Sequence, residues 1–211
     1  MNAANTLKKL GIEKTFEYIY KDPDKNMPKI MDWADKFADG EFPTQREMIR
    51  EAITNPEHPY YDFIRHLIND VDPKVTKTLA VNFFINSALV GWKKEEELRK
   101  KYNCNIPWAI LLDPTSACNL HCTGCWAAEY GHKLNLTYDE IDDIICQGKK
   151  LGVYLYIYTG GEPLVRKKDL IRLCEKHSDC VFLCFTNATL IDEEFADEML
   201  RVGNFVPAIS L

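Results

Sequence analysis

The stretch that decides the fold is Trp108–Trp126, WAILLDPTSACNLHCTGCW. It begins with an apolar run of strand length and passes directly into a loop that holds three cysteines. A second apolar run, 153-VYLYIY-158, is rich in β-branched and aromatic residues and ends in Thr159-Gly-Gly-Glu-Pro163. In a (β/α) architecture, active sites gather in loops at the carboxyl ends of the strands. The sequence therefore predicts two neighbouring strands whose C-terminal ends form one site.

The rest of the C-terminal half repeats this alternation of strand and helix. Thr137-Tyr-Asp-Glu140 is a capping box that opens a helix, and Gly152 fits its C-cap. Further helices are predicted at 169–176 and 193–202, and further strands at 180–185 and 205–211. Apolar strand, loop, helix and apolar strand is the pattern of parallel βα units. We predict an α/β fold, a partial (β/α) barrel with about four strands.

The first hundred residues differ from this pattern. Apolar residues recur there at helical spacing, and one long helix, or two broken at Gly91, is predicted over 75–102. We therefore divide the chain into an all-helical N-terminal domain, 1–106, and the βα region, 107–211. The chain is 211 residues long and carries a net charge of −6, which gives no reason to expect a nucleic-acid partner.

No apolar run approaches the ~20 residues that a membrane-spanning helix needs, and the N-terminus has no signal-peptide core. We predict a cytoplasmic protein that does not enter the membrane. In a reducing compartment, eight cysteines indicate metal binding, catalysis or simple burial rather than disulfides. Four of them lie within predicted helices or strands and are expected to be small buried hydrophobic residues: Cys146, Cys174, Cys180 and Cys184.

The remaining cluster, Cys118, Cys122 and Cys125, can bring three thiolates to one soft metal centre. A [4Fe–4S] cluster normally takes four thiolates, so three leave one iron with an open position for a ligand. The alternative is structural zinc with His121 or Cys104 as the fourth ligand. His121 is adjacent to Cys122, and Cys104 precedes the strand, so both are sterically unfavourable.

The triad together with Gly160-Gly161-Glu162-Pro163 resembles the radical S-adenosylmethionine superfamily. The resemblance spans residues ~108–211 and implies a (β/α) barrel core. It implies that the three cysteines bind a [4Fe–4S] cluster and that Gly160, Gly161 and Glu162 contact the amine of S-adenosylmethionine. Reductive cleavage of that cofactor to a 5′-deoxyadenosyl radical, followed by hydrogen abstraction from a substrate, is the implied activity.

The resemblance also bears on three single positions. Gly124 stands where the family usually has an aromatic residue whose backbone lies near the adenine, and Trp126 follows two places later. Asn187, a candidate cofactor-binding residue at the end of the third strand, belongs to a segment similar to the Thr-Asn-Gly-Thr of related enzymes, with Ala188 in place of the glycine. Ser210 matches a position near the cofactor's ribose. The run Arg166-Lys167-Lys168 is expected to be solvated surface at a helix start.

The substrate, a peptide or a small molecule, is not specified by these residues, and an electron donor such as flavodoxin or ferredoxin is expected. Two rival functions stay open: a non-catalytic iron–sulfur or zinc module, and an inactive fragment of a larger enzyme. The second arises because ~105 residues of βα pattern fall short of the ~250 of a complete eight-unit barrel. On this basis the sequence predicts a C-terminally truncated chain.

Overall fold

The computed structural model describes residues 11, 14–37, 43–125, 127, 131 and 133–210. The chain folds as two compact units, Met1–Lys77 and Thr78–Leu211. The first unit is helical where it is described, which confirms the predicted helical N-terminal region. It contains α2 (Pro23–Phe37), α3 (Pro43–Thr54), α4 (Tyr61–Asn69) and the start of α5 (Pro73–Ala80). Within it, Arg50 of α3 pairs with Asp32 and Asp35 of α2.

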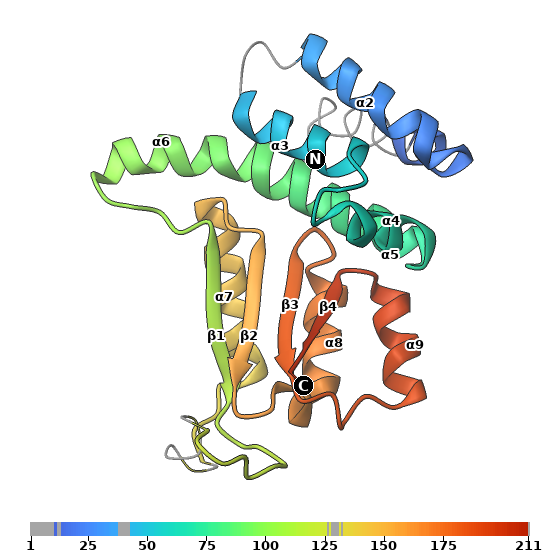
Figure 1. Ribbon diagram of the computed structural model, residues 1–211. Helices are drawn as coiled ribbons and strands as arrows, with labels where there is room; N and C mark the ends of the chain where they lie inside the picture. Colours follow the sequence, from blue (N-terminus) through green and yellow to red (C-terminus); the bar gives the residue numbers. More distant parts are fainter. Residues whose placement is uncertain are drawn as a thin grey trace. The chain divides into compact units, whose positions relative to one another are not determined.

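The second unit is built on one parallel sheet (Figure 1). Its strands are β1 (Ala109–Thr115), β2 (Leu155–Gly160), β3 (Val181–Thr186) and β4 (Phe205–Ile209), in the spatial order β1-β2-β3-β4. Each neighbouring pair is parallel, with Leu111 opposite Ile157 and Ile157 opposite Leu183. The predicted α/β class with four strands is confirmed.

Helices connect the strands and begin and end where the sequence provides caps. They are α7 (Tyr138–Leu151), the 3₁₀ turn η3 (Pro163–Arg166), α8 (Lys167–Lys176) and α9 (Glu193–Val202). Thr137 and Glu140 form the reciprocal capping box that was predicted, which satisfies two backbone N–H groups at the start of α7. Gly152 ends α7 in the left-handed conformation, as expected for a C-cap glycine.

The core lies between the sheet and these helices. Tyr156, Tyr158 and Phe182 are fully buried there, and the Phe182 ring stacks on both tyrosine rings with centroids 5.7 and 5.6 Å apart. They pack with apolar side chains of α7, α8 and α9, such as Ile145 and Leu170. The other face of the sheet, which carries Leu111 and Phe185, is more open to solvent.

The helical segment that precedes the sheet is continuous. The π-helix η1 (Val81–Gly91) joins α5 to α6 (Trp92–Tyr102), and Gly91 does not break it. Gly91 is needed for close packing, because a Cβ there would lie 2.3 Å from the carbonyl oxygen of Gly152. Asn82 of η1 donates to the carbonyl of Cys180. Both contacts lie just before strands begin, so the carboxyl edge of the sheet stays open for the cysteine loop (Figure 1).

The boundary of 106/107 that we predicted from composition stays a prediction. The compact units divide earlier, after Lys77, and η1 and α6 belong to the unit that contains the sheet. None of the described helices combines the length and apolar character required to cross a membrane.

Candidate functional site

The cysteine loop starts at an irregularity in β1. Leu112 lies opposite Tyr158, but the next paired residue is Thr115, opposite Gly160, so Asp113 and Pro114 form a bulge. A bulge at a strand end is a common device for redirecting the chain beside a site. Here it directs the chain out of the sheet and into the loop that carries Cys118.

The base of this loop is closed by hydrogen bonds between its two ends. The backbone N–H of Ser116 donates to the carbonyl of Leu134 at 2.8 Å, and the N–H of Leu136 donates to that of Pro114 at 3.1 Å. Between them, the Thr115 hydroxyl donates to the Asn135 side-chain oxygen at 2.5 Å. The loop therefore leaves and re-enters the sheet edge at a fixed place.

The Gly-Gly-Glu segment packs directly against the start of the loop. The N–H of Gly161 donates to the carbonyl of Thr115 at 3.0 Å, and the N–H of Glu162 donates to that of Ala117 at 2.8 Å. A Cβ at residue 161 would lie 2.3 Å from the Ala117 oxygen, which is closer than any side chain can come. Glycine is thus required at 161 because another backbone occupies the space of a side chain.

The structure brings the three cysteines to one cavity. A pocket of about 130 Å³ is lined by Cys118, Cys122 and Cys125 together with Gly161 and His121. Cys122 and Cys125 are exposed and Cys118 is half-buried, so the thiols are accessible. The two motifs that the sequence analysis placed on neighbouring strand ends therefore meet in space.

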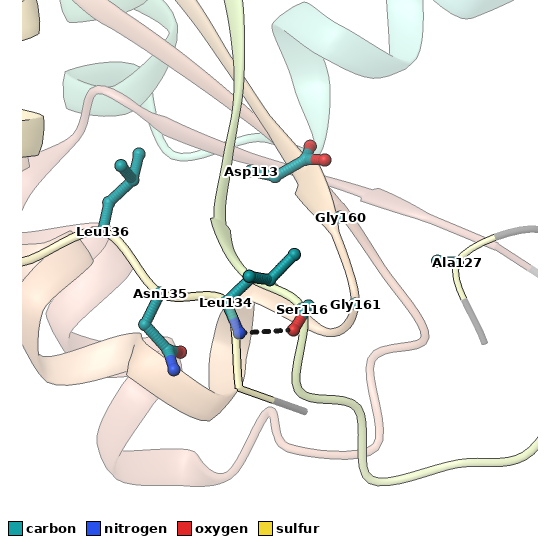
Figure 2. Close-up of a pocket in the computed structure, with 8 residues that line it drawn as sticks. All are labelled: Asp113, Ser116, Ala127, Leu134, Asn135, Leu136, Gly160 and Gly161. Atoms are coloured by element: carbon teal, nitrogen blue, oxygen red, sulfur yellow. Dashed lines mark hydrogen bonds between the residues drawn. The ribbon is translucent and has the colours of Figure 1, made fainter. Parts of the chain in front are cut away.

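Figure 2 shows a second cavity, which is larger than the thiol pocket. It measures about 440 Å³ and shares Ser116, Ala127 and Gly161 with the thiol pocket. Its other lining residues are Asp113, Leu134, Asn135, Leu136 and Gly160. The size falls in the ~300–1,000 Å³ range of small-molecule sites, and the mixture of apolar and polar lining is typical of them.

Glu162 does not present a free carboxylate to either cavity. It is only 2 % exposed. Its Oε1 accepts hydrogen bonds from the Leu164 N–H at 2.9 Å and the Thr186 hydroxyl at 2.8 Å, and its Oε2 accepts from the Asn187 N–H at 2.8 Å. Three donors fixed by the protein hold this carboxylate between β2 and β3.

Asn187 lies at the end of β3, as predicted, and its side chain reaches the cysteine loop. Its amide Nδ2 donates to the side-chain oxygen of Asn119 at 3.0 Å. Ser210 follows β4 and is exposed, and its N–H donates to the carbonyl of Thr186 at 2.9 Å. The candidate residues that follow the ends of the four strands thus lie at the same edge of the sheet.

Gly124 lies in the turn between the second and third cysteines. Its φ is +76°, in the left-handed region, and the space around it is open. The exposed turn is closed by a hydrogen bond from the Cys125 N–H to the Cys122 carbonyl at 3.2 Å. Trp126, named with Gly124 in the sequence analysis, lies outside the described residues.

Arg166 is one residue that the sequence analysis misjudged. It was expected on a solvated surface, but it is half-buried and its guanidinium donates to the carbonyls of Pro114 and Leu136. These two carbonyls belong to opposite ends of the cysteine loop, so Arg166 fastens the loop base to η3. No local sequence pattern distinguishes an arginine with this role from one in solvent.

The other cysteines behave as predicted, with one exception. Cys174, Cys180 and Cys184 are buried, and burial raises the pKa of each thiol, which keeps them protonated. Cys146 is only half-buried, and its Sγ lies within 4.8 Å of ligand atoms of Asp142 and His177. The Asp142 carboxylate already binds Lys176 at 2.8 Å and His177 at 2.9 Å.

Comparison with known proteins shows what this part of the chain resembles. Residues 112–211 match the family model of the radical SAM superfamily. This segment of the chain contains both motifs described above. Over these residues, just under half of its length, the chain is similar to the radical SAM superfamily, whose members use a [4Fe–4S] cluster and S-adenosylmethionine.

Individual relatives share this segment of the chain. A GTP 3′,8-cyclase of Alkaliphilus oremlandii is 48 % identical over 100 residues, which cover 44 % of this chain and 31 % of the cyclase. A PqqA peptide cyclase of Bradyrhizobium diazoefficiens is 33 % identical over 102 residues, 46 % of this chain and 27 % of that enzyme. An uncharacterised protein of Archaeoglobus fulgidus is 32 % identical over 113 residues, 52 % of this chain and 26 % of the relative.

Among solved structures, the crystal structure of Streptococcus suis SuiB bound to S-adenosylmethionine is similar at 24 % identity with a TM-score of 0.48. The alignment covers 71 % of this chain and 34 % of SuiB. This chain thus spans less than a third of the length of the three relatives named above.

Proposed function

We propose that this chain holds a [4Fe–4S] cluster on Cys118, Cys122 and Cys125 and binds S-adenosylmethionine beside it for radical chemistry. The observation that carries the proposal is the single cavity lined by the three thiols and by Gly161 of the Gly-Gly-Glu motif. When bound, the reduced cluster supplies the electron that cleaves S-adenosylmethionine to methionine and a 5′-deoxyadenosyl radical, which abstracts hydrogen from a substrate.

The three thiols of the cavity are not arranged as the ligands of a single zinc ion among the described residues. Sulfur ligands of one tetrahedral zinc lie about 3.8 Å apart, since each is ~2.3 Å from the metal. Among the described residues, Asp142, Cys146 and His177 have three ligand atoms within 4.8 Å of one another, whereas the Cys118, Cys122 and Cys125 thiols do not form such a group. The thiolates of a [4Fe–4S] cluster each bind a different iron, so they lie farther apart than the sulfur ligands of one zinc ion.

The adjoining cavity of about 440 Å³ is the proposed site of S-adenosylmethionine. The backbone of Gly160 and Gly161 lines it, and we propose that these residues contact the cofactor's amine through the main chain. Because the carboxylate of Glu162 is already held by three donors, its proposed role is to fix that backbone. Asp113 supplies the carboxylate that lines the cavity.

The remaining contacts follow from the strand ends. Gly124 and Ser210 stay candidates for the adenine and ribose contacts, since both are exposed beside the site-bearing edge. The substrate class, peptide or small molecule, and the electron donor are proposals for the whole protein. The cytoplasmic location and the domain boundary after residue 106 also stay predictions.

A non-catalytic iron–sulfur or zinc module is the competing function. It accounts for the thiol pocket but gives no role to the second cavity that opens beside it. The two functions therefore differ in one measurable property, the binding of S-adenosylmethionine to the metal centre.

Anaerobic reconstitution with iron and sulfide tests the proposal. We expect about four irons per chain, loss of this iron in Cys122→Ala, and retention in Cys104→Ala, which removes an exposed cysteine outside the pocket. Adding S-adenosylmethionine to the reduced wild type should change the electron paramagnetic resonance spectrum of the cluster. Zinc without iron–sulfide uptake, or a spectrum that S-adenosylmethionine leaves unchanged, would refute the proposal.

A further inference from the structure

A closed ring of hydrogen bonds joins the cysteine loop to the end of β3. The Asn187 amide donates to the Asn119 oxygen at 3.0 Å, and the Asn119 amide donates to the Thr189 hydroxyl at 2.8 Å. The Thr189 hydroxyl donates in turn to the Asn187 oxygen at 2.7 Å. Each side chain donates once and accepts once within the ring, so none of the three can turn without breaking two bonds.

The position of this ring in the chain gives it a function. Asn119 directly follows Cys118, and the N–H of Leu120 donates to the Cys118 sulfur at 3.4 Å. At the β3 end of the ring, the backbone N–H of Asn187 donates a hydrogen bond to the Glu162 carboxylate at 2.8 Å. The ring thus connects the first thiol to the segment that lines the adjoining cavity.

The ring is not explained by the stability of the fold. Asn119 and Thr189 are exposed and Asn187 is half-buried, and exposed hydrogen bonds contribute little to folding because water replaces them. What the ring does constrain is the exposed part of the loop beyond its base, since the ties at Thr115 and Ala117 lie before Cys118.

We propose that Asn119, Asn187 and Thr189 are positioning residues, which hold Cys118 in register with the Gly160–Glu162 backbone so that cluster and S-adenosylmethionine meet at the correct separation. This inference rests on the proposed function. It assigns the Asn187 side chain to the loop rather than to the cofactor, and it adds two residues, Asn119 and Thr189, that neither motif contains. Removal of such outer partners of metal ligands typically costs about 10–100-fold in metal affinity or in activity.

The test compares Thr189→Val with Thr189→Ser. Valine keeps the shape of threonine but has no hydroxyl, so it breaks two bonds of the ring, whereas serine retains the hydroxyl. Asn119→Ala removes the side chain that the cysteine loop contributes to the ring, and with it two of the three hydrogen bonds. Each variant is reconstituted anaerobically, its iron is counted, and S-adenosylmethionine is titrated while the resonance spectrum of the reduced cluster is recorded.

We expect all variants to keep about four irons per chain. In Thr189→Val and Asn119→Ala the apparent dissociation constant for S-adenosylmethionine should rise about tenfold, while Thr189→Ser resembles the wild type. Amide hydrogen exchange of the metal-free chain should be faster around residues 117–122 in the first two variants only.

Unchanged affinity and unchanged exchange in Thr189→Val would overturn the inference, as would an equal loss in Thr189→Ser. These outcomes differ from failure of the proposed function, in which the wild type itself takes up no iron or does not respond to S-adenosylmethionine. In that case the positioning role fails too, even if the exchange data show that the ring restrains the loop.

Discussion

The hydroxyl of Thr186 donates a 2.8 Å hydrogen bond to the carboxylate of Glu162, and both side chains are buried. One residue ends β3 and the other follows β2, so this bond joins two βα units at the carboxyl edge of the sheet. It places the acidic residue of the Gly-Gly-Glu motif in the supporting structure beneath the cavity rather than on its surface.

Glu162→Gln should destabilise the chain by about 2 kcal/mol, because the new amide group faces a backbone donor where an acceptor is required. The measurement is urea unfolding monitored by circular dichroism. Glu97→Gln is the matched control, since Glu97 is exposed on α6 and should change the free energy of unfolding by less than about 0.5 kcal/mol. Equal effects of the two changes would show that the buried contacts of Glu162 are unimportant.

Gly161→Ala should disrupt the thiol pocket, because its Cβ would lie 2.3 Å from the Ala117 oxygen and 2.6 Å from the Ser116 oxygen. We expect a loss of about 1–3 kcal/mol in stability and reduced iron uptake. Gly124→Ala is the comparison: the space there is open, and only the cost of a φ of +76°, about 1 kcal/mol, applies. The idea of backbone packing at 161 is wrong if both variants lose the same stability.

Ala188→Gly should stabilise the chain by about 1 kcal/mol. Ala188 has a φ of +61°, which glycine adopts without a Cβ penalty. Ala188 replaces the glycine of the similar segment in related enzymes, and the turn forms nevertheless. Ala196→Gly, within α9, should destabilise the chain by about 1 kcal/mol, because glycine is unfavourable inside a helix. A destabilised Ala188→Gly in thermal denaturation would contradict the strain argument.

His177 should make the chain less stable as the pH falls. Burial lowers the pKa of His177 below its ordinary 6.5, although the hydrogen bond with Asp142 partly opposes this. Below the unfolded pKa of about 6.5 the unfolded chain binds the proton more readily than the folded chain, so stability declines. The loss should develop from about pH 6.5 downward.

The measurement for His177 is the midpoint of thermal unfolding between about pH 5 and pH 7.5. His177→Gln should show a weaker pH dependence, since glutamine does not titrate. Asp142 does not confound this range: hydrogen bonds from Lys176 and His177 lower its pKa below 3.8 although burial opposes them. Its contribution is lost only at more acidic pH. Identical slopes for wild type and variant would exclude His177 as the cause.

The sequence by itself determined the elements and the two motifs. Near-continuous apolar runs separated by helical segments predicted parallel strands, because helices connect such strands and pack on the sheet. Caps such as Thr137 and Gly152 fixed helix ends because they act within one turn of the chain. The spacing of Cys118, Cys122 and Cys125 predicted a metal-binding loop because the chain between them is too short to carry the thiols far apart.

Only the tertiary structure decided what each polar side chain faces. The parallel register of β2 and β3 brings Thr186 and Asn187 to Glu162, where both donate hydrogen bonds to its buried carboxylate. Asn119 and Arg166 acquire their roles from partners 68 and 52 residues away, at Asn187 and Pro114. A hydrogen bond between distant residues depends on the packing of whole strands, and no local pattern in the sequence records it.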